Sequence, residues 1–114
     1  MLVELPQPWT PAQATDRIRA IALGEYDLSY KWHAMEQLTE RGLIIGDLTF
    51  LLKFGFVYDA AQPSTRKEFY KYRMQCRTPN SNNREVRVVV IPDWKRKQLK
   101  ALTVMWADEP LVKS

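Results

Sequence analysis

The sequence is poor in the residues that build disulfides, metal sites and glycine-rich loops. Its 114 residues include one cysteine, Cys76, one histidine, His33, and four glycines. A single cysteine cannot form an internal disulfide, which fits a reducing compartment. One cysteine and one histidine cannot supply the usual ligands of a structural zinc ion. No glycine-rich phosphate loop or Gly-x-Ser-x-Gly motif is present, so the sequence predicts no cofactor and no metal centre.

Long apolar segments are also lacking. No apolar run approaches the roughly 20 residues that cross a bilayer, and the first residues lack the basic start and apolar run of a signal peptide. Hydrophobic residues make up 46% of the chain and charged residues 26%, which is ordinary for a globular protein. We therefore expect a single soluble, cytoplasmic domain over residues 1–114 that does not contact a membrane.

Positive charge is concentrated in one part of the chain. The net charge is only +4. Residues 1–65 hold five Lys or Arg against eight acids, whereas residues 66–100 hold eleven against three. This segregation favours a phosphate-bearing or acidic partner.

The first half of the chain has helical spacing. Residues 1–9 are expected to be an extended lead-in, and residues 10–55 to be helical. Thr10 and Gln13 resemble a capping box that starts a first helix, which Gly24 ends. A second helix is predicted over residues 29–41, and a third from Gly46 to the residue before Gly55.

Beyond residue 55 the spacing of apolar residues changes from helical to alternating. Short strands are predicted over residues 56–60, 67–78, 85–91 and 99–107, with a loop at 79–83 and a tail at 109–114. Within 67–78, one face carries Tyr70, Tyr72, Met74 and Cys76, and the other carries Lys71, Arg73, Gln75 and Arg77. The predicted fold class is α+β, with N-terminal helices packed on a four-stranded, mainly antiparallel sheet over residues 56–108.

The cationic face of the long strand is the first candidate site. Hairpin connections are expected to add five further cations of the basic block to it: Arg84, Arg87, Lys95, Arg96 and Lys97. Guanidinium groups bind phosphate and aromatic rings accept bases, so the surface suits a nucleic-acid backbone. The alternative is a solvated sheet face whose cations prevent edge pairing.

A helical face supplies the second candidate. At 3.6 residues per turn, His33, Gln37 and Arg41 share one side of the second helix. Histidine and arginine, with a neighbouring acid, suit a general base and an anion stabiliser for metal-independent RNA cleavage by the 2′-hydroxyl. The alternative is a polar helix face without chemistry. Thr103, in the last strand, is either an orienting hydroxyl or an ordinary strand residue.

The order of these segments resembles a known family. The run Trp32-His33-Ala34-Met35-Glu36-Gln37-Leu38-Thr39-Glu40-Arg41-Gly42-Leu43, the glycine-ended short helix, the tyrosine-bearing strand and the final Leu102-Thr103-Val104 resemble a bacterial domain-of-unknown-function family related to RelE-like toxins. The resemblance covers about residues 29–107. It implies a compact α+β toxin-like fold, metal-independent cleavage of mRNA, often on the ribosome, and a small antitoxin that covers the sheet. The family often has an arginine where this chain has Gln37.

Together these observations predict an endoribonuclease of the RelE-like toxin type, inhibited by a cognate antitoxin. Its expected catalytic residues are His33, Arg41, Arg73, Arg87 and Thr103, and its expected RNA-binding residues are Lys71, Arg77, Arg84, Lys95, Arg96 and Lys97. The alternative is a non-catalytic nucleic-acid-binding or protein-interaction module on the same fold.

Overall fold

Three helices and one mixed sheet make up residues 5–109, the part of the chain that the computed structural model describes. The predicted lead-in and tail therefore lie partly outside the described residues. The α+β class is confirmed. In chain order the elements are α1 (Pro11–Leu23), β1 (Asp27–Tyr30), α2 (Trp32–Glu40), α3 (Ile45–Phe54), β2 (Phe56–Val57), β3 (Gln62–Pro63), β4 (Tyr70–Arg77), β5 (Glu85–Asp93) and β6 (Gln98–Trp106).

The sheet differs from the predicted four-stranded antiparallel one. It has six strands in the order β1-β6-β5-β4-β2, with β3 on the same edge of β4 as β2. The pairs β2–β4, β3–β4, β4–β5 and β5–β6 are antiparallel, whereas β1 runs parallel to β6. Because β1 precedes α2 in the chain, its pairing with the last strand joins two distant parts of the sequence.

The prediction of one helix over residues 29–41 was wrong at its start. Residues 27–30 pair with residues 98–101 of β6, and the N–H of Lys31 donates to the carbonyl of Ala101 at 3.2 Å. The helix begins only at Trp32. A strand partner about 70 residues away overrides the local helical preference, which is weak compared with tertiary hydrogen bonding.

Local sequence signals fix the other two helices. The predicted capping box is confirmed in α1, where Gln13 N–H donates to Thr10 Oγ1 at 3.2 Å and Thr10 N–H donates to Gln13 Oε1 at 3.0 Å. In α3, Asp47 Oδ2 accepts the N–H of Ile44 at 2.9 Å. Gly55 is the C-cap of α3, and glycine is required there because a Cβ would lie 2.6 Å from the carbonyl oxygen of Leu51.

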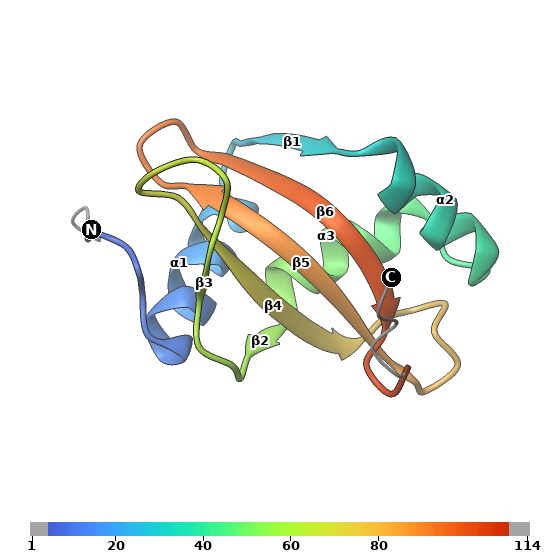
Figure 1. The fold of residues 1–114 in the computed structure, drawn as a ribbon. Coiled ribbons are helices and arrows are strands. Elements are labelled where there is room, and N and C mark those ends of the chain that lie inside the picture. The colour runs from blue at the N-terminus through green and yellow to red at the C-terminus, as the bar shows by residue number, and fades with distance from the viewer. Residues whose placement is uncertain (1–4, 110–114) are drawn as a thin grey trace.

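The hydrophobic core lies between two helices and one face of the sheet. Helices α1 and α3 lie behind the sheet in Figure 1, and α2 lies at its edge beside β6. The predicted alternation is confirmed, because Tyr72 and Met74 of β4 are fully buried and Arg73 between them is not. The buried side chains of the sheet are Val57, Tyr72, Met74, Val86, Val88, Val90, Pro92, Leu99, Ala101 and Val104.

The connection between β2 and β4 leaves the sheet and returns along its edge. The predicted strand over residues 56–60 is only two residues long, and the predicted strand from residue 67 begins at Tyr70. Residues 66–69 instead form a turn, in which Glu68 has a φ of 73°. Gln62 pairs with Lys71, so this connection borders the face of the sheet that no helix covers. No helix among residues 5–109 has both the length and the apolar character needed to cross a bilayer.

Candidate nucleic-acid interface

The face of the sheet opposite the helices is cationic and is not covered by a helix. Cross-strand pairing sets Arg73 opposite Val89 and Gln75 opposite Arg87. Thr103 and Met105 of β6 continue these two rows. We call this surface the open face, and it consists of Lys71, Arg73, Gln75, Arg87, Val89, Thr103 and Met105.

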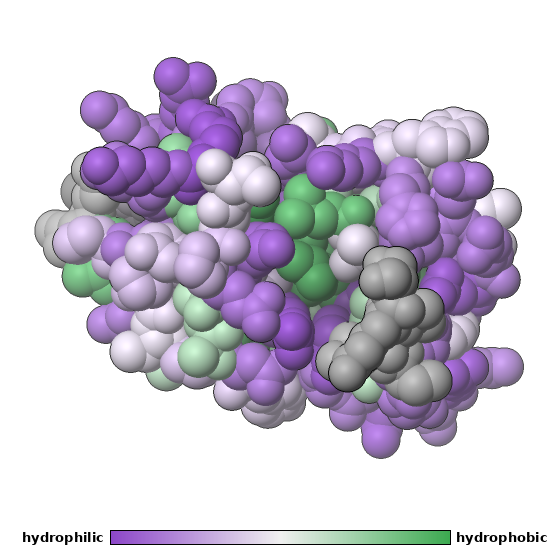
Figure 2. All heavy atoms as spheres, viewed as in Figure 1, coloured by the Kyte–Doolittle hydropathy of each residue, from purple (hydrophilic) through white to green (hydrophobic). Residues whose placement is uncertain are grey.

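A shallow pocket of about 200 Å³ lies on the open face. Figure 2 shows apolar atoms gathered at the middle of this side of the molecule with hydrophilic atoms around them. The pocket is lined by Gln62, Lys71, Arg73, Arg87, Val89, Leu102, Thr103 and Met105. Cations beside an apolar floor can bind a phosphate and the base attached to it together.

A β-bulge contributes to the floor of this pocket. Val89 pairs with Thr103, whereas Val90 pairs with Ala101, so Leu102 is an extra residue in β6. A bulge changes the direction of the side chains next to it. Here it lets both Leu102 and Thr103 line the same pocket.

Hydrogen bonds along the open face fix the guanidinium of Arg87. Its Nε and Nη2 both donate to Gln75 Oε1, at 3.1 and 3.0 Å. Gln75 Nε2 in turn donates to Glu85 Oε1 at 2.9 Å. Arg87 is therefore oriented before a ligand arrives, which lowers the entropy cost of binding.

Arg73 is held more loosely than Arg87. Its Nη1 lies 3.9 Å from Asp59 Oδ2, and the Asp59 side chain is 51% exposed. An ion pair of this length at the surface contributes little stability. A phosphate can therefore replace Asp59 as the partner of Arg73 at small cost.

His33 and Arg41, two of the predicted catalytic residues, do not line the pocket of the open face. His33 is exposed on α2 and lines none of the pockets described here. Arg41 donates from Nε and Nη2 to the two carboxylate oxygens of Glu109, at 2.8 and 2.9 Å. The hydrogen bond from Arg41, helped by the N–H of Trp106, holds the pKa of Glu109 below its usual value against the effect of burial. Arg41 thus ties α2 to the chain after β6.

Gln37, the residue that departs from the family pattern, has a structural contact. Its Oε1 accepts the N–H of Val104 at 2.7 Å. Strand β1 pairs with β6 only as far as Ala101. Gln37 therefore satisfies a backbone donor on the part of the β6 edge that β1 leaves unpaired.

The sequence predicts that the other cations join the open face in one patch. In the structure they lie at the two ends of β5 instead. Lys95 and Arg96 line a second pocket at the β5–β6 turn, and Lys97 Nζ lies 3.5 Å from the ring centroid of Trp94. At the other end of β5, Arg84 pairs with Asp108 at 2.8 Å. Arg77 is exposed at the end of β4. Because β5 has nine residues, these two ends are roughly 25–30 Å apart.

Other reactive side chains are not suited to chemistry at this site. Burial, with a contribution from Glu85, raises the pKa of the Cys76 thiol to about 11, so the thiol is protonated at neutral pH. Burial also raises the pKa of Tyr72 to about 12. Among residues 5–109, no three His, Cys, Asp or Glu side chains are grouped so that they could hold a metal ion. The chemistry of the pocket thus depends on its cations, amide and hydroxyl.

Sequence reasoning missed several residues of the pocket. Alternation along β5 was a usable signal for Val89, which lies two residues from Arg87. The places of Gln62 and Leu102 depend on the path of the β2–β4 connection and on the bulge, for which the sequence carries no clear signal.

In comparisons with known proteins, no family model, no curated protein and no solved structure matches this chain. The resemblance to the RelE-like toxins therefore stays a prediction.

Proposed function

We propose that the protein binds single-stranded RNA through the open face, as an RNA-binding protein of the RelE-like toxin type. One observation carries this proposal: Lys71, Arg73 and Arg87, from two different strands, line one pocket with an apolar floor. The other face of the same strands is buried under helices. Cations grouped on the uncovered face of a sheet are what a polyanion requires.

The chemistry of the pocket favours single-stranded RNA over a duplex. The guanidinium groups of Arg73 and Arg87 suit the phosphate oxygens, and the floor formed by Val89, Leu102 and Met105 suits an unstacked base. The Thr103 hydroxyl can donate to or accept from a ribose hydroxyl or a base edge. In a duplex the bases stay stacked and cannot reach the floor.

Binding of a fluorescent single-stranded RNA, followed by anisotropy at several salt concentrations, tests this proposal. The double variant Arg73→Ala/Arg87→Ala is expected to lose about tenfold or more in affinity. The slope of log K against log salt should fall by about 1.4, since each lost phosphate contact contributes about 0.7. Lys53→Ala, in the last turn of α3, is the control for loss of one charge away from the open face. Wild-type protein that binds no RNA, or a double variant that binds as well as wild type, would overturn the proposal.

Cleavage of the bound RNA is the second candidate function. It is favoured because two guanidinium groups and a hydroxyl line the same pocket, where they can stabilise the charge of the transition state when the 2′-hydroxyl attacks. Since His33 lies outside, Lys71 is the proton-transfer group that lines this pocket. An antitoxin of acidic character would cover the same surface.

RNA cleavage with and without ribosomes, in the presence of a metal chelator, tests this candidate. Lys71→Ala should lose cleavage while RNA affinity falls only a few-fold, because one of three cations is removed. His33→Ala should cleave normally. RNA that stays intact in both conditions would leave the protein as a binding module.

A further inference from the structure

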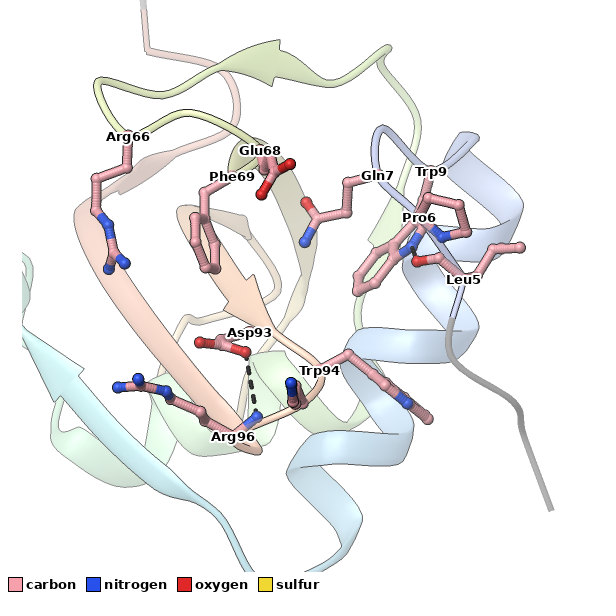
Figure 3. Close-up of a pocket in the computed structure, with 11 residues that line it drawn as sticks. Leu5, Pro6, Gln7, Trp9, Arg66, Glu68, Phe69, Asp93, Trp94 and Arg96 are labelled. Atoms are coloured by element: carbon pink, nitrogen blue, oxygen red, sulfur yellow. Dashed lines mark hydrogen bonds between the residues drawn. The ribbon is translucent and has the colours of Figure 1, made fainter.

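A second pocket, of about 490 Å³, lies at the end of the sheet where β5 turns into β6. Figure 3 shows it between three segments that are far apart in the sequence: the residues before α1, the turn before β4 and the turn after β5. We call it the end pocket. Its principal polar and aromatic lining residues are Gln7, Arg66, Phe69, Asp93 and Arg96.

The end pocket is separate from the open face and lies beyond it along β5. Asp93 is the last residue of β5 and lies four residues after Val89. Side chains an even number of residues apart share one face of a strand. At about 3.3 Å per residue, Asp93 lies roughly 13 Å beyond Val89 along the strand. An extended nucleic-acid strand held at the open face can therefore run on into the end pocket.

Three cations and two carboxylates, Glu68 and Asp93, line the end pocket. The ion pairs of residues 5–109 involve neither Arg66, Lys95 nor Arg96. Figure 3 shows the guanidinium groups of Arg66 and Arg96 on the same side of the pocket, with the ring of Phe69 pointing into it. The Arg66 guanidinium carbon lies 4.5 Å from the Phe69 ring centroid. Unpaired guanidinium groups next to an aromatic ring match a phosphate and its base.

The carboxylate of Asp93 can add polar recognition. Asp93 Oδ1 accepts the backbone N–H of Arg96 at 3.1 Å. Its Oδ2 has no hydrogen bond within the described part of the chain. This oxygen can accept from a ribose hydroxyl or from the amino group of a base.

The opposite wall is rigid, so the pocket exists before a ligand binds. Gln7 Nε2 donates to the carbonyl of Pro92 at 3.2 Å, and Gln7 Oε1 accepts the hydroxyl of Tyr72 at 3.1 Å. Trp9, only 2% exposed, stacks on Tyr72 with 5.6 Å between ring centroids. The buried pair of rings thus anchors this wall to the core.

We propose that the end pocket binds one nucleotide of the RNA, next to the segment held at the open face. The base packs against Phe69, the phosphate lies between Arg66 and Arg96, and a hydroxyl or amino group donates to Asp93 Oδ2. This inference rests on the proposed RNA-binding function and extends it: the substrate is a single strand long enough to reach both pockets, and the end pocket contributes to base preference.

Two measurements test the inference. The first is anisotropy with a single-stranded RNA of about 12 nucleotides, using the variants Phe69→Leu and Arg66→Ala/Arg96→Ala. Phe69→Leu keeps an apolar side chain and removes the stacking ring. Lys67→Ala is the matched control, because it removes a charge from an exposed neighbour that does not line the pocket. We expect both pocket variants to bind about fivefold to tenfold more weakly and the control to bind as wild type does.

The second measurement is titration of the wild-type protein with 5′-AMP, followed by amide shifts in a nitrogen–proton NMR spectrum. Shifts are expected at residues 66–69 and 93–96, and Phe69→Leu should weaken them. Pocket variants that bind RNA as tightly as wild type, while Arg73→Ala/Arg87→Ala does not, would overturn the inference and leave the proposed function standing. A protein that binds 5′-AMP at these residues but binds no RNA would contradict the proposed function. It would also contradict the binding of an RNA nucleotide in the end pocket, which would then be a site for a free nucleotide. Absence of both signals would overturn the two proposals together.

Discussion

The two faces of the sheet differ completely although they belong to the same strands. On one face Tyr72, Met74 and Val88 are fully buried under α1 and α3. On the other, Lys71, Arg73 and Arg87 line a pocket on an uncovered surface. A step of one residue along β4 changes a side chain from core to candidate binding group.

This difference separates stability from binding. Substitutions on the buried face should unfold the protein, and those on the open face should leave the fold intact while they change RNA affinity. The predictions below test this separation, beginning with the largest expected effect.

Tyr72→Ala should destabilise the protein most. Tyr72 is fully buried, its ring stacks on Trp9, and its hydroxyl accepts the N–H of Trp9 at 2.9 Å. The loss in the free energy of unfolding is expected to be about 3–5 kcal/mol, measured by urea denaturation. Its neighbour on the open face provides the control: Lys71→Ala should change this free energy by less than about 0.5 kcal/mol. Equal losses for the two variants would contradict the separation of the faces.

Asp47→Ala should have the next largest effect, about 2–3 kcal/mol at neutral pH. Asp47 is 1% exposed and accepts hydrogen bonds from the N–H of Ile44 and from the backbone and side-chain nitrogens of Asn80. These contacts join the start of α3 to the loop between β4 and β5. Substitution by alanine leaves the donors without their acceptor.

The contribution of Asp47 should also depend on pH. Burial opposes ionisation of Asp47, but the hydrogen bonds from Ile44 and Asn80 outweigh it and lower the pKa from the ordinary value of 3.8. A lowered pKa in the folded state means that the stabilisation is complete above pH 3.8 and is lost as the pH falls below it. The difference in unfolding free energy between wild type and Asp47→Ala should therefore shrink under acid conditions. A difference that stays constant would show that the carboxylate charge is not what stabilises this contact.

Substitutions of two glutamines, Gln37 and Gln75, should have smaller effects on stability and on RNA affinity. Gln37→Leu should cost about 1–2 kcal/mol of stability, because the N–H of Val104 loses its acceptor, and should not change RNA affinity. Gln75→Leu should change stability by less than about 0.5 kcal/mol, but should weaken RNA binding about twofold to threefold because Arg87 is no longer oriented. Thermal unfolding and anisotropy on the same samples measure both. If Gln37→Leu weakened RNA binding and Gln75→Leu did not, the RNA would lie on the α2 side of the sheet.

His33→Ala should have the smallest effect. The side chain is exposed on α2 and does not line the open-face pocket. Unfolding free energy should change by less than about 0.5 kcal/mol, and RNA binding and any cleavage should equal those of wild type. Loss of cleavage in this variant would move the catalytic centre from the open face to α2.

Much of the fold could be predicted where local rules decide it. The capping box of Thr10 and Gln13 involves residues three apart, and alternation along β4 requires only that one face be buried. The same alternation placed Lys71 and Arg73 together, and Arg87 and Thr103 indeed line the pocket that contains them.

The rest could not be predicted because it depends on contacts between distant segments. Nothing local shows that residues 27–30 will pair with β6. Arg41 is the C-cap of the helix that carries His33, but Glu109, beyond β6, binds its guanidinium. The basic block also looked continuous in sequence, whereas the length of β5 divides its cations between the open face, the end pocket and the end of the sheet near Arg84.

The parallel pairing of β1 with β6 has a consequence for synthesis of the chain. Residues 27–30 leave the ribosome early, but their partners lie about 70 residues later. The nascent chain therefore carries an unpaired strand segment until β6 emerges, and closing so long a loop is slow compared with forming a hairpin. Strands β4 and β5 can pair as soon as both have emerged, whereas β1 joins the sheet only when synthesis has passed residue 101. During that interval residues 27–30 are an unpaired strand segment that a chaperone or a second nascent copy can contact.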